Sequence, residues 1–141
     1  MENRISQEEK KIVFQIGGLL QYSNDIFDVY KDREEGIWTQ VNSVSDILLV
    51  EADYLKEMNK TFDLCNDSSY PKATKKEFLK NLKLLCARTL VCMDQFKKVQ
   101  KNHQGVFPVS DLSRQELVCD MEKPINLIRM ARRYVTLVLN K

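Results

Sequence analysis

Long stretches without helix breakers most constrain what this chain can fold into. Its 141 residues contain only four glycines and three prolines. The segments between them carry apolar residues at the three- and four-residue spacing of amphipathic helices. No segment shows the alternating pattern of a half-buried strand, and no internal repeat is found. The sequence therefore predicts a single all-α domain over residues 1–141, built as a bundle of four long helices.

The first two helices are placed by their start and stop signals. Ser6-Gln7-Glu8-Glu9 reads as a capping box, which predicts a helix from Ser6 to about Gly36. A second helix is expected to begin between Ser43 and Asp46 and to end in the polar loop 66–71.

The last two helices have weaker signals. Thr74-Lys75-Lys76-Glu77 is a second capping-box pattern, and Gly105 suits the C-terminal stop of the helix that it would open. The last helical region should begin near Ser110 or Ser113. Pro124 is expected to kink or split it, because proline lacks an amide donor and clashes with the preceding turn.

Composition and charge exclude several classes of function. With 22 basic and 20 acidic side chains, the net charge of +2 gives no reason to propose a nucleic-acid surface. No apolar run approaches the roughly 20 residues that span a bilayer, so the chain is not predicted to be transmembrane. The charged first ten residues lack the apolar core of a signal peptide, which favours a cytoplasmic protein. The four cysteines form no C-x-x-C pair and are expected to lie reduced in the core: Cys65, Cys86, Cys92 and Cys119.

One motif carries the chemical information. Asn24, Asp28 and Asp32 are four residues apart, so on a helix they stack on one face about one turn above each other. An amide oxygen and two carboxylates are hard donors of the kind that Mg²⁺ prefers together with water and phosphate oxygens. Like charges at this spacing cost roughly 0.2–0.5 kcal/mol per pair. A helix that accepts this repulsion is a candidate cation site.

The residues around the motif allow a family resemblance to be named. Gly17, Gln21 and Glu35-Gly36 flank the three donors, giving Gln-x-x-Asn-x-x-x-Asp-x-x-x-Asp-x-x-Glu-Gly. This pattern resembles the second aspartate-rich motif of the squalene/phytoene synthase branch of class I isoprenoid synthases. Its spacing is also similar to the Asn/Ser/Glu metal triad of terpene cyclases. The resemblance covers about 20 residues and suggests an isoprenoid-synthase-like half-domain.

The resemblance implies a function for these residues. Asn24, Asp28 and Asp32 would hold Mg²⁺, and the metal would grip the diphosphate of a prenyl substrate or free pyrophosphate. Gln21, one turn before Asn24, would bind or orient the ligand. Lys31 and Arg33 would supply further positive charge to the diphosphate.

The chain also departs from the family pattern. The first aspartate-rich motif of the family precedes the second on a separate helix, whereas the 23 residues before Asn24 contain no aspartate. Asp63 and Asp67 have D-x-x-x-D spacing but follow the motif and run into a loop, so they are not favoured as a ligand pair. The chain resembles the C-terminal half of such an enzyme, and we expect a homodimer or a second chain that supplies the missing half. The alternative is a non-catalytic helical bundle or protein-interaction module, a degenerate or truncated relative.

Other residues have competing interpretations. Gly17-Gly18 lowers helix stability and is expected to allow close helix packing, with room for a substrate tail as the alternative. Trp38 and Phe107 are expected in the core or in a lid rather than in contact with a cofactor. His103 is expected near the carbonyl end of its helix. A cluster of three arginines is expected to form a solvated face or salt bridges, with diphosphate binding as the alternative: Arg129, Arg132 and Arg133.

Overall fold

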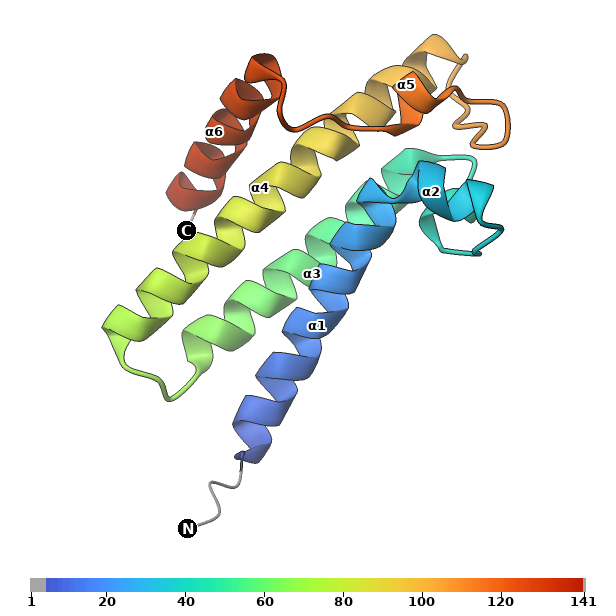
Figure 1. Cartoon of the computed structure of the whole chain (residues 1–141). Helices are drawn as coiled ribbons and strands as arrows, with labels where there is room; N and C mark the ends of the chain where they lie inside the picture. The colour runs from blue at the N-terminus through green and yellow to red at the C-terminus, as the bar shows by residue number, and fades with distance from the viewer. Residues whose placement is uncertain (1–4, 141) are drawn as a thin grey trace.

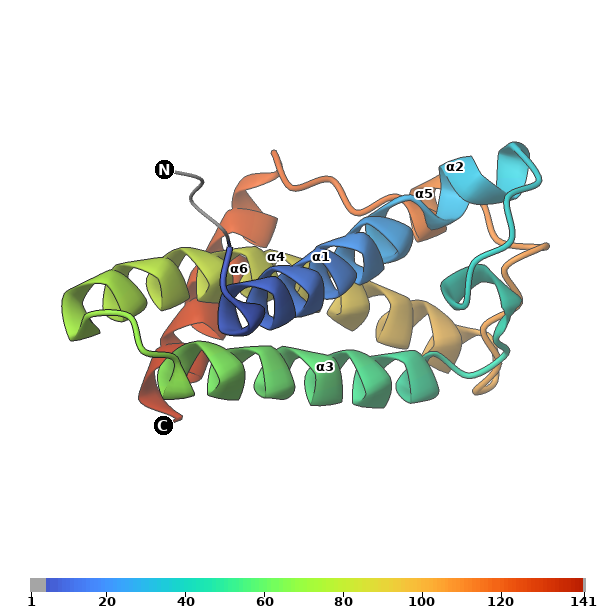
Figure 2. The ribbon, with the colours of Figure 1, turned by 90° about the horizontal axis from the view of Figure 1, so that it is seen from below.

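The computed structural model describes residues 5–140, and every regular element in that range is a helix. The elements are α1 (Gln7–Phe27), α2 (Val29–Glu34), the short 3₁₀ helix η1 (Val41–Ser43), α3 (Ile47–Asp67), α4 (Lys72–Asn102), α5 (Arg114–Leu117) and α6 (Pro124–Leu139). Figures 1 and 2 show that α1, α3 and α4 pack together and that α6 lies along the other side of α4. The all-α prediction is confirmed.

Helix α4 is the centre of the molecule. Between Cys86 and Met93 every side chain except that of Arg88 is buried. A helix of a two-layer bundle buries one stripe, whereas this segment is covered on both sides, by α1 and α3 and by α6. Helix α3 contributes the stripe Ile47, Val50, Tyr54, Met58, Phe62 and Cys65, which recurs every three or four residues.

The first predicted helix is correct at both ends but not continuous. Ser6 caps α1 with the predicted capping box, its hydroxyl oxygen accepting from the Glu9 amide. Gly36 ends the helical segment at a φ of +68°, a conformation that glycine adopts without a Cβ clash. Between them the helix is interrupted at Asp28, where φ and ψ are −92° and 9°. The expectation of one helix through the motif is therefore wrong by this single residue.

The start of α4 corrects a second expectation. The helix begins at Lys72, directly after Pro71, and the Thr74-Glu77 pattern lies inside it rather than at its cap. Proline has a fixed φ, −55° here, which suits the residue at a helix start. The helix therefore begins after Pro71 and not at the weaker capping pattern three residues later. The start of α3 is as predicted, with the Asp46 carboxylate accepting from the Leu48 amide.

The C-terminal region is split rather than kinked. Ser113 and Glu116 form a second capping box around the single turn of α5. Pro124 occupies the first turn of a separate helix, α6, where its missing amide removes no helical hydrogen bond. Gly105 follows the end of α4 with a φ of +85°, as the stop signal predicted. The bundle thus has three long helices and a shorter fourth.

Two composition-based expectations can be compared with the structure. All four cysteines are free and buried, as expected. In the described part of the chain, none of the helices has the length and apolar character needed to cross a membrane.

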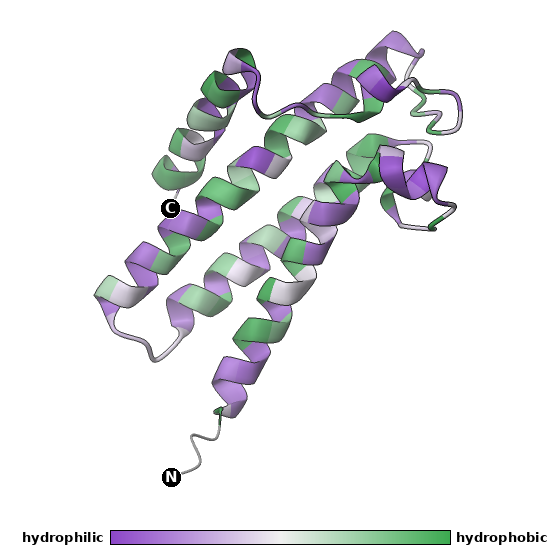
Figure 3. Ribbon diagram, viewed as in Figure 1, coloured by the Kyte–Doolittle hydropathy of each residue, from purple (hydrophilic) through white to green (hydrophobic). Residues whose placement is uncertain are grey.

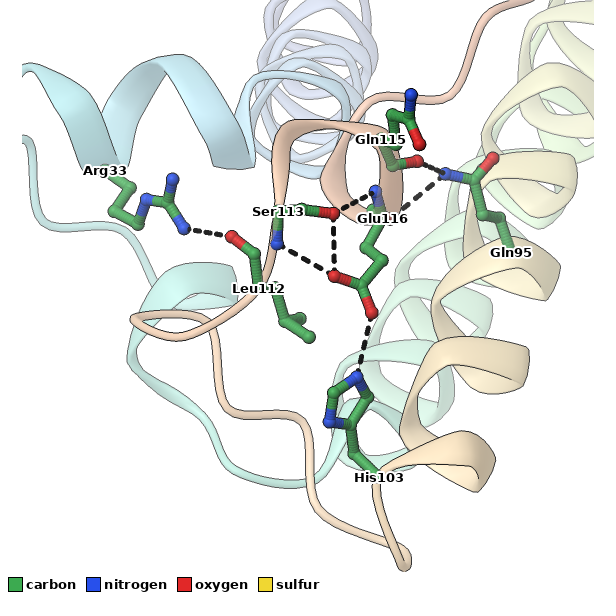
Figure 4. Close-up of polar contacts among 7 residues, drawn as sticks. All are labelled: Arg33, Gln95, His103, Leu112, Ser113, Gln115 and Glu116. Carbon is green, nitrogen blue, oxygen red and sulfur yellow. Dashed lines mark hydrogen bonds and ion pairs between the residues drawn. The ribbon is translucent and has the colours of Figure 1, made fainter.

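The connection between α4 and α6 is held by side chains that donate to its backbone carbonyls (Figure 4). Arg33 on α2 donates to the carbonyl oxygens of Val109 at 2.9 Å and Leu112 at 2.6 Å. Gln95 on α4 donates to the carbonyl oxygen of Glu116 at 3.0 Å. These bonds satisfy carbonyls that no helix or strand pairs, so they fix α5 against both α2 and α4.

The Glu116 carboxylate should stabilise this connection in a pH-dependent way. The His103 ring lies 2.8 Å from it, and the Ser113 amide and hydroxyl also donate to it, which lowers the pKa of Glu116 to about 2. A lowered pKa in the folded state adds stability that is present above the ordinary value of 4.5 and is lost as the pH falls toward 2. We expect Glu116→Ala to lower the urea midpoint at pH 7, and this difference from wild type to shrink as the pH falls from 4.5 toward 2. Glu122→Ala, in the same connection, is the control and should change little. Equal effects of the two substitutions would contradict the assignment.

Candidate functional site

A cavity of about 470 Å³ lies where α1 passes into α2. One wall comes from these helices and the other from the loop that follows α2. The lining residues are Gln21, Asn24, Asp25, Asp28, Asp32, Ile37, Trp38, Thr39 and Gln40. Four of the six residues that the sequence nominated therefore share one cavity: the three motif donors and Gln21.

The three motif donors are joined by backbone hydrogen bonds despite the interruption at Asp28. The Asp28 amide donates to the Asn24 carbonyl oxygen at 2.8 Å, and the Asp32 amide donates to the Asp28 carbonyl oxygen at 2.8 Å. These are the four-residue bonds of an α-helix, so the donors remain about one turn apart. The predicted stacking of Asn24, Asp28 and Asp32 is thus preserved across the break.

Asp32 is the buried member of the row. Its relative exposure is 8%, and among the described residues no side chain or amide donates to its carboxylate. Burial raises the pKa of Asp32, and the carboxylates of Asp28 and Asp25 raise it further. Among the described residues no side-chain oxygen or nitrogen is both buried and unpartnered, so the Asp32 carboxylate oxygens are open to the cavity, where a cation can reach them.

Asp25 is a site residue that the sequence analysis missed. It lies on the cavity wall beside the predicted row, and its carboxylate accepts a 2.8 Å hydrogen bond from the side-chain amide of Gln21. The signal was available: Gln21 and Asp25 are four residues apart, and Asp25 and Asp28 three apart. Gln21 thus orients one carboxylate of the site and lines the cavity itself.

The opposite wall is the loop Ile37–Gln40. The Ile37 amide donates to the Asp32 carbonyl oxygen at 2.8 Å, and the Asn42 side chain donates to the Ile37 carbonyl oxygen at 2.7 Å. Trp38 is 77% exposed beside the carboxylates. It is therefore not a core residue. Phe107 is buried, with its ring centroid 5.2 Å from that of Phe96, as the core interpretation predicted.

The two predicted cationic ligands lie outside the cavity lining. Arg33 points to the α4–α6 connection, where it donates to two carbonyl oxygens and pairs with Glu34 at 2.8 Å. Lys31 is exposed on α2. None of the nine lining residues is basic, so the cavity presents negative charge only.

The glycines, the three arginines and His103 do not line the cavity. A Cβ added at Gly17 or Gly18 would meet no atom within 4 Å, so the expected close helix packing there is wrong. Arg133 pairs with Asp94 on α4, while Arg129 and Arg132 are exposed on α6. The ring of His103, which caps the end of α4, contacts Glu116 rather than helix carbonyls.

The donor set suits a magnesium ion that keeps other ligands. Within residues 5–140, no group of three or more His, Cys, Asp or Glu side chains is already gathered around a point. Mg²⁺ retains several waters and takes phosphate oxygens, so one or two carboxylates suffice to anchor it. Asp28 and Asp32, with the Asn24 amide oxygen, fit that requirement by residue type and by their shared cavity.

Asp32→Asn should stabilise the metal-free protein. Because the folded-state pKa of Asp32 is raised, its ionised form is less favourable in the folded chain than in the unfolded one. This destabilisation is absent below the ordinary value of 3.8 and develops as the pH rises through the raised pKa. We expect a higher denaturation midpoint than wild type at pH 7 in the presence of a chelator, and no difference near pH 3. Asp63→Asn, at an exposed carboxylate of α3, is the control and should leave the midpoint unchanged. A loss of stability in Asp32→Asn at pH 7 would show that a structural contact holds the carboxylate.

Comparison with known proteins gives no match to a family model, to a curated protein or to a solved structure.

Proposed function

We propose that the cavity binds Mg²⁺ together with the diphosphate of a prenyl substrate, in the manner of the second aspartate-rich motif of class I isoprenoid synthases. The observation that supports this proposal is Asp32, a largely buried residue whose carboxylate opens onto the cavity and receives no hydrogen bond from the described residues. It lies in the same cavity as Asn24 and Asp28. Burial and the neighbouring Asp28 and Asp25 carboxylates disfavour the ionised form of Asp32, and a bound cation would offset both effects.

Each residue of the site has a distinct part in this proposal. Asn24, Asp28 and Asp32 present oxygen donors on successive turns, and Gln21 fixes the Asp25 carboxylate beside them. Trp38, on the cavity wall, would exclude water from the bound ligand. When bound, the metal neutralises a diphosphate leaving group.

A second candidate, a binding protein without the reaction, is favoured by one observation. The cavity lining contains no basic side chain, so a diphosphate would depend on the metal alone for positive charge. The chain would then bind the metal and diphosphate weakly and without turnover, as a non-catalytic bundle. Metal-dependent binding is common to both candidates, and release of diphosphate from an allylic substrate separates them.

Trp38 makes the binding proposal directly measurable, because it is the only tryptophan of the chain and lies on the cavity wall. We expect its fluorescence to change when Mg²⁺ and pyrophosphate are added together, and to change less with either alone. The melting temperature should rise in parallel, because a ligand that binds only the folded state stabilises it.

Asp28→Asn tests whether the motif is responsible. Without ligand its stability should equal that of wild type or exceed it by up to about 1 kcal/mol, since like-charge repulsion is relieved. With Mg²⁺ and pyrophosphate it should lose most of the fluorescence and melting responses, while Asp63→Asn should keep both. Wild-type protein that is indifferent to millimolar Mg²⁺ and pyrophosphate would refute the proposal.

We further propose that a second chain, most simply another copy, covers the face of α1 that leads to the site. Val13 is 66% exposed and Phe14 85%, and Gly17 and Gly18 leave open space beside them. Exposed apolar surface of this kind favours association. A covering chain would also bring the positive charge that the cavity lacks.

Association through α1 predicts a homodimer at micromolar concentration. We expect light scattering to report twice the chain mass for wild type and the monomer mass for Phe14→Gln. Leu49→Gln, which changes a similarly exposed apolar residue on α3, should stay dimeric. A strict monomer over this concentration range would exclude self-association and leave only a different partner chain.

A further inference from the structure

Helix α6 has an apolar face that the described part of the chain leaves uncovered. The helix packs along α4 through Asn126, Met130 and Leu137, of which only Asn126 is fully buried. Figure 3 shows that α6 is coloured as hydrophobic along most of its length, and Figure 1 shows it at the edge of the bundle. Six large apolar side chains are between 40% and 74% exposed: Ile125, Leu127, Ile128, Val135, Val138 and Leu139.

The outward face is continuous in space. At 100° per residue, Ile128, Val135 and Leu139 fall within a narrow arc opposite the side that contacts α4. Arg132 and Arg129 lie along one edge of that arc, both exposed. Among the described residues the Arg132 guanidinium has no ion-pair partner, whereas Arg133, nearer α4, pairs with Asp94.

The C-terminal half of the chain, which includes α4 and α6, carries an excess of positive charge. Residues 68–141 carry 15 of the 22 basic side chains and six of the 20 acidic ones. Helix α6 itself contains three arginines and no carboxylate. The near-neutral total charge is therefore the sum of an acidic N-terminal half of the chain, which contains the cavity, and a basic C-terminal half, which contains the apolar face of α6.

We propose that the outward face of α6 docks on the surface of an anionic lipid bilayer. A helix about 24 Å long with an apolar arc and cationic residues at its edge can lie in the interface plane, with its apolar side chains at the acyl boundary. The arginines reach the lipid phosphates from the edge of the arc, because their long stems stay along the apolar surface. Each such cation adds attraction to an anionic leaflet.

Charge favours this occupant over a second copy of the chain. Antiparallel pairing of two α6 faces would bring Arg132 of each copy close to the symmetry axis, where like charges repel. Docking of α6 on the acidic face of another copy is head-to-tail and does not close into a dimer. A nucleic acid would satisfy the arginines but not the exposed branched side chains, since its binding rests on phosphate contacts.

The proposal is tested by flotation of the full chain with two kinds of vesicle. Wild type should float with vesicles of phosphatidylcholine and phosphatidylglycerol, and about tenfold less with phosphatidylcholine alone. Added salt should weaken the binding, because surface charges are screened. The proposal would be overturned if wild type floated with neither kind of vesicle, or if it bound both equally.

Two variants locate the binding on α6. Ile128→Gln combined with Val135→Gln removes apolar area from positions about half exposed, so the fold should tolerate it, as circular dichroism can verify. It should lower binding to the anionic vesicles by about tenfold. Arg132→Glu should lower it by about fivefold or more. Leu49→Gln on α3 and Lys60→Glu, both exposed in the acidic half, are the matched controls and should bind as wild type.

Two outcomes would exclude the lipid surface as the occupant. Controls that lose binding as much as the α6 variants would show that the interaction is not localised. An α6 variant that converts a wild-type dimer to a monomer in light scattering would show that a second copy covers this face. Neither readout involves Mg²⁺ or pyrophosphate, so this proposal stands or fails separately from the proposed function.

Discussion

The burial of α4 on both sides is the constraint on which the other helices depend. Its middle, from Cys86 to Met93, contains small and apolar residues on nearly every face, so a single covering layer would leave half of it in water. Helices α1 and α3 cover one side and α6 the other. Because α6 is a thin outer layer of one helix, it buries its inner stripe on α4 and leaves its own outer surface exposed. The central position of α4 and the exposed face of α6 are thus two results of the same packing.

Helix ends were predictable where a side chain caps the backbone directly. Ser6, Asp46 and Ser113 each accept from an amide two or three residues on, an interaction that is local in sequence and so is visible in it. The start of α4 was mispredicted because Pro71 and the Thr74 pattern compete within a few residues, and the sequence does not rank them. Tertiary arrangement was less accessible. The periodicity of α6 shows an apolar helix, but it does not reveal that α4 covers only one side of it.

The same distinction applies to the candidate site. The row of Asn24, Asp28 and Asp32 follows from helix geometry, and the structure keeps it in one cavity. The directions of Lys31 and Arg33 depend on what surrounds α2. Arg33 turns toward Val109, which is 76 residues away in the chain, and no local pattern contains that information. Asp25 was missed because it stands one position off the four-residue row. The sequence did not place Trp38 on the cavity wall, because the loop fold brings it there.

The two walls of the site are held in place in different ways. The donors are aligned by hydrogen bonds between residues four apart. The opposite wall, Ile37–Gln40, is placed by a loop that returns onto the Asp32 carbonyl and is braced by Asn42. The donor row therefore depends on hydrogen bonds that are local in sequence, whereas the enclosing wall depends on how the loop folds back. Loosening of that loop would open the cavity while leaving the spacing of its donors intact.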